Sequence, residues 1–513
     1  MGIPLYFNKI TNYYKNTISP QKQKCNRLFL DFNGIIHNVY QNVKHTVSMT
    51  LSKAEFENVL IHKVIEYTEY ICTYTGPKEL VYICIDGVAP LPKIQQQRKR
   101  RYLSTWLKLK FKEEGYAWDS NAISPGTEFM KTLNTLLRQY IKNKRCLYEI
   151  ILSDSSYEGE GEHKIFDYIH YHGDSKSIDV IYGLDADLIM LSIICEKSKK
   201  FLLREPQHYH AKIDPNTPFL WFNVDRFKEN LLAYYDNKID IISYVFLCFL
   251  IGNDFLPNLT YLGIHNDGIT KILNAYITIL DNFHSPIIFR NDRDQFQINF
   301  ITLAQLFETL YTDEDKEMLK LHKTYYDKSM IFKTNKLRLE NYGVSHKNES
   351  TKQMFDTKNW RLQYYTLLFD MNIYNDNVIN TVCESYISGL LWIADYYFNK
   401  KTSSNWFYMY NYSPTILDVY NYLEVNKSNI TQKKQTYDIS SDLQLLMILP
   451  IHSKLILPME LQELVSNTSS IGHFYPEDFK IQSYLKTKLH ECFPILPKLN
   501  INELQIAYLN TIS

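Results

Sequence analysis

Five apolar or partly apolar runs in the first half of the chain each end in acidic residues. The runs are RLFLDF, VYICID, EIILSD, DVIYGLDAD and FLCFLIGND. Because the carboxyl ends of neighbouring parallel strands line one edge of a sheet, where open α/β sheets bind ligands, their acids are expected to form one cluster. These acids are Asp31, Asp86, Asp154, Asp185 with Asp187, and Asp254, and a further pair, Glu160 and Glu162, lies in the loop GEGEHK.

Clustered carboxylates repel each other in a cleft, and hard cations relieve that repulsion. Oxygen ligands favour Mg²⁺ or Mn²⁺, and acid-rich sites suit phosphoryl transfer assisted by two metal ions. Burying so many acids without cations would cost several kcal/mol each. We expect Asp154 to stay outside the metal site, either behind the ligands or as a cap. The expected metal ligands are Asp31, Asp86, Glu160, Glu162, Asp185, Asp187 and Asp254.

Taken singly, two of these motifs also have purely structural interpretations. Asp185 and Asp187 flank one alanine between an expected strand and an expected helix, so they could merely end the strand and cap the helix. Glu160 and Glu162 flank a glycine, which lets the backbone aim both carboxylates at one ion. Their alternative is a pair of first-turn acids that stabilise the following helix. The combined set favours the metal site.

The apolar periodicity predicts an α/β fold. Between the expected strands lie helical patterns, such as residues 56–72 and 128–143, whose apolar residues recur every three or four positions. Alternation of strands and helices indicates a parallel sheet, and continuous apolar runs indicate strands covered on both faces. The strands are expected at residues 27–32, 80–86, 149–154, 179–184 and 200–204.

Three regions are predicted along the chain. Residues 1–311 form a domain that carries the acidic site, and residues 312–358 are a polar, charged connector with some helix. Residues 359–513 form a second, mixed α/β region that is packed against the first and completes the substrate cleft.

Composition restricts the class of protein. The chain carries 56 Lys and Arg against 56 Asp and Glu, so any nucleic-acid site must be a local patch. Its eight cysteines show no C-x-x-C spacing, which favours buried reduced thiols. The longest uncharged apolar run, VFLCFLIG, is far below the roughly 20 residues that cross a bilayer, and the amino terminus lacks a signal-peptide pattern. A soluble intracellular protein without a membrane partner is expected.

One stretch is strongly basic. Residues 93–112 contain eight basic residues and no acid, and the stretch begins seven residues after Asp86. In a helix, spacings of three and four place a lysine, a glutamine and two arginines on one face, where arginine can bind phosphate bidentately. An ordinary solvated helix and a nuclear localisation signal are the alternatives, and proximity to the acids favours the phosphate clamp. Its residues are Lys93, Gln97, Arg100 and Arg101.

Two aromatic side chains are candidates for stacking on bases. His37 in DFNGIIH could stack on a base or satisfy a hydrogen bond in the core, and the core is the favoured interpretation from the residues alone. Trp406 in NWFYMYNYSP could form a stacking platform, worth about 1 to 3 kcal/mol per base, or belong to the core.

Together these segments resemble the 5′-to-3′ exoribonucleases of the Xrn/Rat family. The similarity covers about residues 1–268 and rests on MGIPLYF, LFLDFNGIIHN, IDGVAPLPKIQQQRKRRY, DSNAISPGTEFM, SDSSYEGEGEHKIFDYI, YGLDADLIMLSI, LLREP and FLCFLIGNDFLPNL. It resumes near Trp360, where YISGLLWIADYYF, WFYMYNYSP, LLMILPIHSKLILP and FYPEDFKI resemble the family's second catalytic region.

The resemblance implies a nuclease core of the PIN/5′-nuclease type, in which the seven acids hold two Mg²⁺ ions, with Mn²⁺ as a substitute. It implies that the basic face binds a 5′-monophosphate and that His37 and a tryptophan, which we assign to Trp406, bracket the terminal bases. Family members degrade single-stranded RNA processively to 5′-mononucleotides and reject capped or triphosphate ends. A role in RNA degradation, such as mRNA decay, and a cytoplasmic location are expected. A nuclear location and protein partners, such as a decapping activity, stay open.

The chain departs from the family pattern in three places. Residues 102–118 are shorter than the projecting helix usual there, and Tyr157 stands near the position where a proline commonly precedes the GEGE motif. A compact form without the large carboxy-terminal extension is expected. Two alternatives are a flap-type DNA nuclease and a non-catalytic RNA-binding scaffold of the same fold. The segment FLPNLTYLGIHNDG stands where a flap-type nuclease has a glycine-rich hairpin, which weakens the DNA-nuclease alternative. The intact acidic set argues against the non-catalytic scaffold.

Overall fold

The structure of the chain is a computed structural model. The structure describes residues 3, 5–111, 115–206, 216–328, 359–369, 371, 375–400, 406–428, 430, 437–486 and 489–512. Within these residues, no helix is both long and apolar enough to cross a lipid bilayer.

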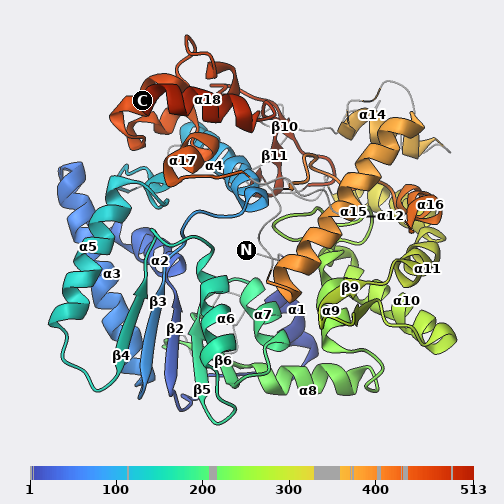
Figure 1. The fold of residues 1–513 in the computed structure, drawn as a ribbon, viewed down its shortest axis with the longest axis horizontal. Helices are drawn as coiled ribbons and strands as arrows, with labels where there is room; N and C mark the ends of the chain where they lie inside the picture. Colours follow the sequence, from blue (N-terminus) through green and yellow to red (C-terminus); the bar gives the residue numbers. More distant parts are fainter. Residues whose placement is uncertain are drawn as a thin grey trace.

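A seven-stranded sheet lies at the centre of the amino-terminal half (Figure 1). Its order is β1-β7-β6-β5-β2-β3-β4, in which the five strands from β6 to β4 are parallel and β7 and β1 are added antiparallel. This confirms the predicted parallel α/β core. The strands are β1 (Ile18–Ser19), β2 (Arg27–Asp31), β3 (Leu80–Cys84), β4 (Glu149–Ser153), β5 (Ile178–Tyr182), β6 (Lys199–Arg204) and β7 (Leu220–Asn223).

Helices cover both faces of the sheet, because successive strand residues point to opposite sides. In β2, Leu28 and Leu30 belong to one buried cluster and Phe29 to another. The first cluster holds the sheet against α2 (Phe32–Val43), α3 (Lys53–Thr75) and α5 (Glu128–Asn143). The second includes residues of α1 (Tyr6–Tyr13), α6 (Gly161–His172), α7 (Asp187–Ile194) and α8 (Val224–Tyr234).

Local sequence signals explain the ends of α3. The hydroxyl of Ser52 accepts from the backbone N–H of Glu55, whose carboxylate accepts from the backbone N–H of Ser52, which is a capping box. The helix ends at Gly76, whose φ of 64° is left-handed and costs little for a residue without Cβ. The helix is therefore longer at both ends than residues 56–72, because periodicity alone does not mark the caps.

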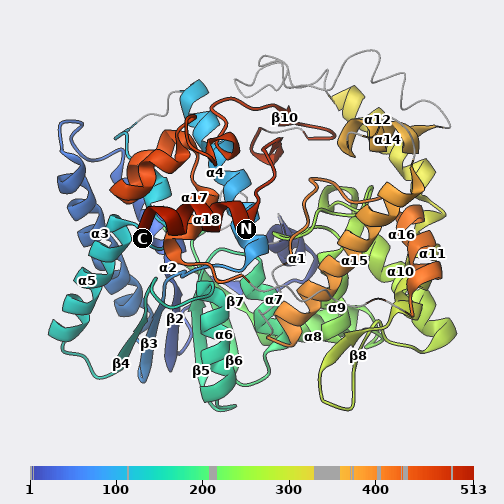
Figure 2. The ribbon, with the colours of Figure 1, turned by 45° about the horizontal axis from the view of Figure 1, so that its top comes forward.

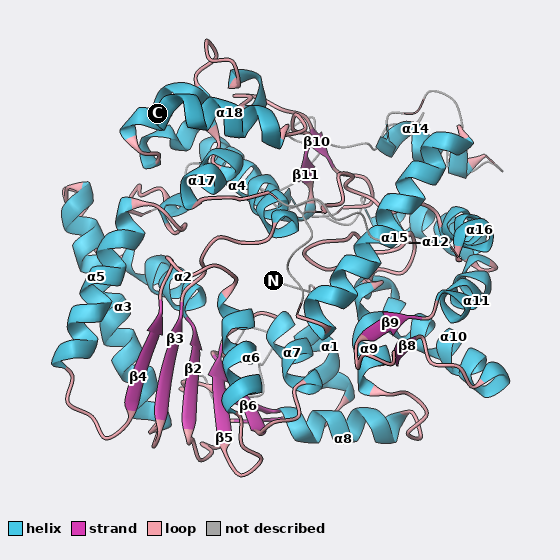
Figure 3. Cartoon of the chain, in the orientation of Figure 1, coloured by secondary structure: helices cyan, strands magenta, loops and turns pink. Residues whose placement is uncertain are grey.

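The second half is mainly helical (Figure 3). The large buried cluster that begins under the sheet continues without a break through Leu306 of α11 to Tyr386 of α15. Its elements are α9 (Ile241–Phe249), η2 (Ile264–Asn266), α10 (Gly268–Phe283), β8 (Ile288–Arg290), β9 (Phe296–Ile298), α11 (Phe300–Tyr311), α12 (Glu314–Lys328), α14 (Trp360–Phe369), α15 (Asp376–Phe398) and α16 (Ile416–Asn426).

The predicted connector falls partly on α12, and residues 329–358 of it lie outside the described residues. The first residue of α12 is buried, although the next two are exposed. Glu314 is fully buried, pairs with Arg361 of α14 at 3.1 Å and accepts from the backbone N–H of Ile416 at 2.7 Å. The start of α12 is thus part of the core rather than a free linker, and the domain boundaries stay predictions.

The carboxy-terminal residues pack around α4 (Leu91–Phe111), which lies beside α17 in both views (Figures 1 and 2). The buried guanidinium of Arg98 donates to the carbonyl oxygens of Phe474 at 2.6 Å and Pro497 at 2.8 Å. The last third of the chain therefore holds the basic helix in place. The remaining elements are η1 (Ser120–Ala122), α17 (Ser441–Ile448), η4 (Ile451–Ile456), η5 (Met459–Val465), η6 (Gly472–Phe474), β10 (Ile481–Gln482), η7 (Leu489–Glu491), β11 (Phe493–Pro494) and α18 (Ile501–Ile512).

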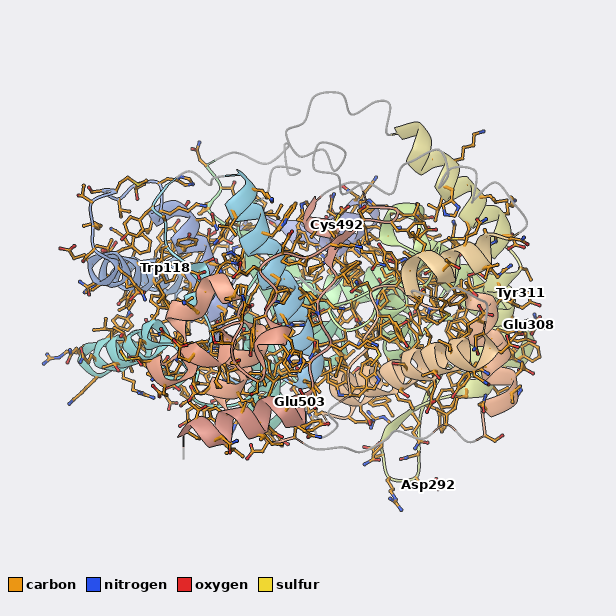
Figure 4. The ribbon with its side chains drawn as sticks, turned by 90° about the horizontal axis from the view of Figure 1, so that it is seen from above. Trp118, Asp292, Glu308, Tyr311, Cys492 and Glu503 are labelled. Atoms are coloured by element: carbon orange, nitrogen blue, oxygen red, sulfur yellow. The ribbon has the colours of Figure 1, made fainter. Side chains whose placement is uncertain are left out.

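Seen from above, α4 runs between the two halves of the molecule (Figure 4). Trp118, beside the helices of the sheet, lies on one side of it, and Glu308 and Tyr311 of α11 lie at the opposite end. Because Ile94, Arg98 and Tyr102 of this helix are buried, it is not an ordinary solvated helix.

Candidate active site

The strand register brings the first two acids together. Asp31 is the last residue of β2 and pairs with Cys84, the last residue of β3, so that Asp86 follows two residues beyond on the neighbouring strand. Asp86 accepts from the backbone N–H of Gly161 at 2.7 Å, while its own N–H donates to Asn33 at 3.2 Å. The GEGE loop is thereby tied to the sheet edge.

Two glycines keep space for the carboxylates. A Cβ at Gly161 would lie 3.3 Å from oxygens of both Asp31 and Asp86, and one at Gly183 would lie 3.3 Å from the Cβ of Asp31. Asp185 and Asp187 follow Gly183, and Asp187 begins α7. Glycine at these two positions therefore allows the carboxylates to approach each other closely. For Gly161 this agrees with the role expected of the glycine between Glu160 and Glu162.

Four of the seven predicted acids lie in two groups of close ligand atoms. Ligand atoms of Asp31, Glu162 and Asp185 lie within 4.8 Å of one another, and so do those of Glu160, Glu162 and His163. Glu162 belongs to both groups, so the two are adjacent. His163 was not predicted as a ligand; its adjacency to Glu162 in the sequence was the only available signal.

Asp254 reaches the cluster from a helical element. The run FLCFLIG is α9 and the turn after it, not a strand, so the expectation that Asp254 ends a sheet strand is wrong. The run is buried on all sides, and an apolar segment of this length cannot be assigned to helix or strand by periodicity alone. Asp254 still joins the other acids, through a cation at the centre of the site.

That cation is Lys93. Its ammonium lies 2.5 Å from Oε2 of Glu160 and 2.8 Å from Oδ2 of Asp254, and its side chain is 10% exposed. Burial lowers the pKa of Lys93, but the charges of Asp254 and Glu160 outweigh that effect, and the net pKa lies well above its usual value. Lys93 is therefore charged and lies among the acids, and its contact with a 5′-phosphate stays a prediction.

Burial and mutual repulsion raise the pKa of several carboxyls. Burial, followed by the charges of Asp86 and Asp185, raises the pKa of Asp31 well above its usual range. Burial likewise raises the pKa of Glu162, and burial followed by the charge of Asp254 raises that of Asp187 to about 7. The raised pKa values of these carboxyls mean that Lys93 does not by itself compensate the repulsion among the described acids.

The donor set fits divalent cations. Oδ1 of Asp187 is buried and has no hydrogen-bond partner among the described residues, and the converging atoms are mostly carboxylate oxygens. Hard cations such as Mg²⁺ and Mn²⁺ prefer oxygen ligands, and they would relieve the repulsion that raises the carboxyl pKa values.

Two further side chains support the cluster, and neither was predicted. The hydroxyl of Tyr396, from α15, donates to Oε1 of Glu160 at 2.6 Å. The ammonium of Lys164 donates to the carbonyl oxygens of Ile85 and Tyr157, at 2.8 and 2.7 Å, and so joins the end of β3 to the GEGE loop. Tyr396 is far from the site in sequence and left no local signal.

Asp154 lies outside the acid groups, as expected. It accepts from the backbone N–H of Ser156 at 2.9 Å and forms an ion pair with Arg138. Its role is to cap the turn after β4.

The other residues of the basic motif follow Lys93 along α4. Gln97 is half-buried, and its Oε1 has no hydrogen-bond partner in the described part of the chain. Arg101 donates to the backbone oxygens of Asn121 at 3.0 Å and Ile123 at 3.4 Å, whereas Arg100 is exposed. Arg100 is thus the more available of the two arginines for a ligand.

His37 lies on α2 with an exposed side chain, so the core interpretation does not hold for it. Arg100, Arg101 and Asp185 are among the charges that act on its imidazole. Trp406 is half-buried: its ring would lie 2.4 Å from a Cβ at Gly389 and its centroid is 6.2 Å from that of Trp392. Both rings have surface left for a ligand, and their stacking roles stay predictions.

The chain matches two family models. The model described as XRN 5′-3′ exonuclease N-terminus matches residues 1–206, and the model described as Xrn1 helical domain matches residues 234–354 and 309–497. Among solved structures, the catalytic core of Rad2 in complex with DNA substrate aligns with 69% of this chain and 85% of that chain, at a TM-score of 0.33 and 14% identity.

Curated relatives match nearly the whole chain. It is 27% identical to 5′-3′ exoribonuclease 1 of Homo sapiens, with 97% of this chain and 33% of that protein covered. For 5′-3′ exoribonuclease 1 of Schizosaccharomyces pombe the identity is 25%, with 97% and 47% covered. For 5′-3′ exoribonuclease 2 of the same yeast it is 25%, with 95% and 70% covered. The chain thus spans a third to a half of the first two relatives, and on the two family matches it belongs to the Xrn family of 5′-3′ exonucleases.

Proposed function

We propose that the protein is a metal-dependent 5′-to-3′ exoribonuclease that removes 5′-mononucleotides from single-stranded RNA with a 5′-monophosphate. The observation that carries this proposal is that acids at the end of β2, after β5, at the start of α6 and in the turn after α9 meet the first turn of the basic helix α4. Lys93 marks that meeting point, because it contacts both Glu160 and Asp254. The names of the relatives support the reaction class.

Two Mg²⁺ ions would be held by the seven predicted acids. Bound there, they would supply an acidified water as nucleophile and stabilise the charge on the departing 3′-oxygen. The residues themselves prepare the site: Gly161 fixes Asp86 through its N–H, and Lys164 holds the loop that carries Glu160 and Glu162. Such fixed geometry contributes to the rate because little is reorganised when the substrate reacts.

The 5′ end would be recognised beside the acids. Gln97 and Arg100 offer an amide and a guanidinium on successive turns of α4, and Arg101 is already fixed by backbone oxygens. A guanidinium matches one phosphate bidentately. A terminal phosphate held here would set the distance to the scissile bond, so that one nucleotide is removed in each step.

Single-stranded substrate is part of the proposal. His37 and Trp406 would stack on unpaired bases, and base-aromatic stacking is worth about 1 to 3 kcal/mol per base. A duplex has no free base faces to offer. Repeated stacking after each cut would support processive digestion.

The proposal is tested with Asp187→Ala, measured on 5′-phosphorylated RNA in Mg²⁺. Hydrolysis should be abolished while RNA affinity changes little, because Asp187 belongs to the acid site and not to the basic face. Asp292→Ala is the matched control, since Asp292 is exposed on the turn between β8 and β9 and lies at an edge of the molecule in Figure 4. Undiminished digestion by Asp187→Ala would overturn the proposal.

A further inference from the structure

A tyrosine of α15 contacts the acid cluster. Tyr396 of α15 donates its hydroxyl to Oε1 of Glu160 at 2.6 Å, and both side chains are almost fully buried, at 2% and 3% exposed. The two residues are 236 positions apart in the sequence. A hydrogen bond between a neutral donor and a buried carboxylate is strong and directional.

The ring of Tyr396 is held on several sides. It stacks on Trp392 with centroids 4.7 Å apart at 20°, and it contacts the ring of His163 at 4.0 Å. The ring of Phe255, the residue after Asp254, is nearly perpendicular to that of Tyr396, with the two ring centroids 5.6 Å apart. A ring packed in this way has little rotational freedom, so its hydroxyl defines a fixed point in the site.

Glu160 is bound differently by its two neighbours. Lys93 holds Oε2 at 2.5 Å by charge, and a divalent cation that binds the same carboxylate competes directly with this ammonium. Tyr396 holds Oε1 as a neutral donor, which a cation does not repel in the same way. After cation binding, Tyr396 would therefore remain the contact that orients Glu160.

The same face of α15 also supports the predicted stacking residue. Gly389, Trp392 and Tyr396 follow one another at spacings of three and four, which places them on one side of the helix. The ring of Trp406 occupies the space that a side chain at Gly389 would fill, and its centroid is 6.2 Å from that of Trp392. Trp406, Trp392, Tyr396 and Glu160 thus form one continuous row of contacts.

We propose that Tyr396 is a positioning residue for the metal ligand Glu160, and that the Gly389-Trp392-Tyr396 face of α15 fixes Glu160 and Trp406 in one rigid frame. This inference rests on the proposed function, because it takes Glu160 to be a metal ligand. Residues behind metal ligands orient them, and their loss typically weakens metal binding by 10- to 100-fold.

The test is the affinity for Mn²⁺, used as the probe ion and measured by titration calorimetry on the full chain without RNA. Tyr396→Phe keeps the ring and removes only the donor, so Mn²⁺ should bind about 10-fold more weakly. The rate of RNA hydrolysis should fall at low Mg²⁺ and recover at high Mg²⁺, with RNA affinity unchanged. The matched control is Tyr364→Phe in α14. It removes a similarly buried hydroxyl, which donates to the carbonyl oxygen of Ser413 at 2.8 Å, and it should leave the Mn²⁺ affinity unchanged.

A double-mutant cycle separates positioning from packing. In the Glu160→Gln background, adding Tyr396→Phe should change Mn²⁺ affinity little, because the group it orients is already altered. The inference would be overturned if Tyr396→Phe weakened Mn²⁺ binding equally with Glu160 and with Glu160→Gln, or if Tyr396→Phe alone left Mn²⁺ affinity unchanged. Neither result would affect the proposed function. Absence of Mn²⁺ binding by the unaltered protein would overturn both. If Tyr396→Phe does not fold, Trp392→Phe replaces it and should weaken Mn²⁺ binding in the same direction, and unchanged affinity would contradict the inference.

Discussion

The ammonium of Lys93 lies 2.5 Å from Oε2 of Glu160, so the first turn of the basic helix ends inside the acid cluster rather than beside it. The same ammonium reaches Asp254 at 2.8 Å. In the absence of divalent ions, Lys93 is the positive charge that holds these two acids together.

Replacing Lys93 with methionine should destabilise the metal-free protein by about 3 kcal/mol, because removal of one partner leaves buried carboxylates unpaired. Mg²⁺ should restore part of the loss, since it binds the same acids. The measurement is urea unfolding in EDTA and in Mg²⁺. Lys131→Met is the control, because the pair of Lys131 with Glu128 is exposed and contributes little. Equal stability of Lys93→Met and the unaltered protein in EDTA would contradict the account.

Arg100→Ala should reduce the preference for 5′-monophosphate over 5′-hydroxyl RNA at least 10-fold without affecting folding, because Arg100 is exposed while its neighbours are held by other contacts. The preference is read from competition between two labelled RNAs that differ only in the 5′ group. The control is Arg226→Ala, which removes an exposed arginine on α8 and should leave the preference for the 5′-monophosphate unchanged. An equal decline on both RNAs would mean that Arg100 provides only general charge.

The contribution of Asp187 to the stability of the metal-free protein should decrease as the pH rises from about 4 to about 7. Burial and Asp254 raise the folded pKa of Asp187 from 3.8 to about 7, so within this window the folded state binds more protons than the unfolded state. The pKa values of Asp31 and Glu162 are raised in the same direction. One such group contributes at most about 1.4 kcal/mol per pH unit. In EDTA, the unfolding free energy of the unaltered protein relative to that of Asp187→Asn, which has no titrating group at this position, should fall over this range, and it should fall less in Mg²⁺. A relative rise with pH in EDTA would contradict the raised pKa of Asp187.

Gly161→Ala should weaken divalent-ion binding while the fold is retained. Its Cβ would lie 3.3 Å from the carboxylate oxygens of Asp31 and Asp86, and 3.0 Å from the carbonyl oxygen of Cys84, so these groups must shift by a few tenths of an ångström. We expect at least a 10-fold weaker Mn²⁺ affinity by calorimetry. Gly159→Ala has no neighbour within 4 Å of its added Cβ and is the control for the loop, although its φ of 96° adds backbone strain. Unchanged Mn²⁺ affinity in Gly161→Ala would show that ion binding does not depend on the space that Gly161 leaves beside Asp31 and Asp86.

Much of the sheet could be predicted because its strands are continuous apolar runs. β2, β3 and β4 begin at the expected residues and end one or two residues earlier than expected. The acids could be placed at one edge because parallel strands share their carboxyl ends. The secondary structure of the segment before Asp254 could not be assigned. A short apolar run that is buried on all sides has the same hydrophobic pattern whether it forms a helix or a strand.

The position of Lys93 and the role of Tyr396 could not be predicted. Helical spacing places Lys93 on a face with Gln97 and Arg100, but it does not say which acids that face meets. Tyr396 lies among many aromatic residues of α15, and only the three-dimensional packing distinguishes it from its buried neighbour Tyr397. Contacts between distant segments leave no local periodicity to detect.

The most direct test of the central claim is time-resolved digestion of a single-stranded RNA that carries a 5′-monophosphate and a 3′-end label. In Mg²⁺ the products should be 5′-mononucleotides released from the 5′ end, with slow attack on the 5′-hydroxyl form and none in EDTA. Fragments from internal cuts, digestion from the 3′ end, or equal digestion in EDTA would contradict a metal site coupled to a 5′-phosphate pocket.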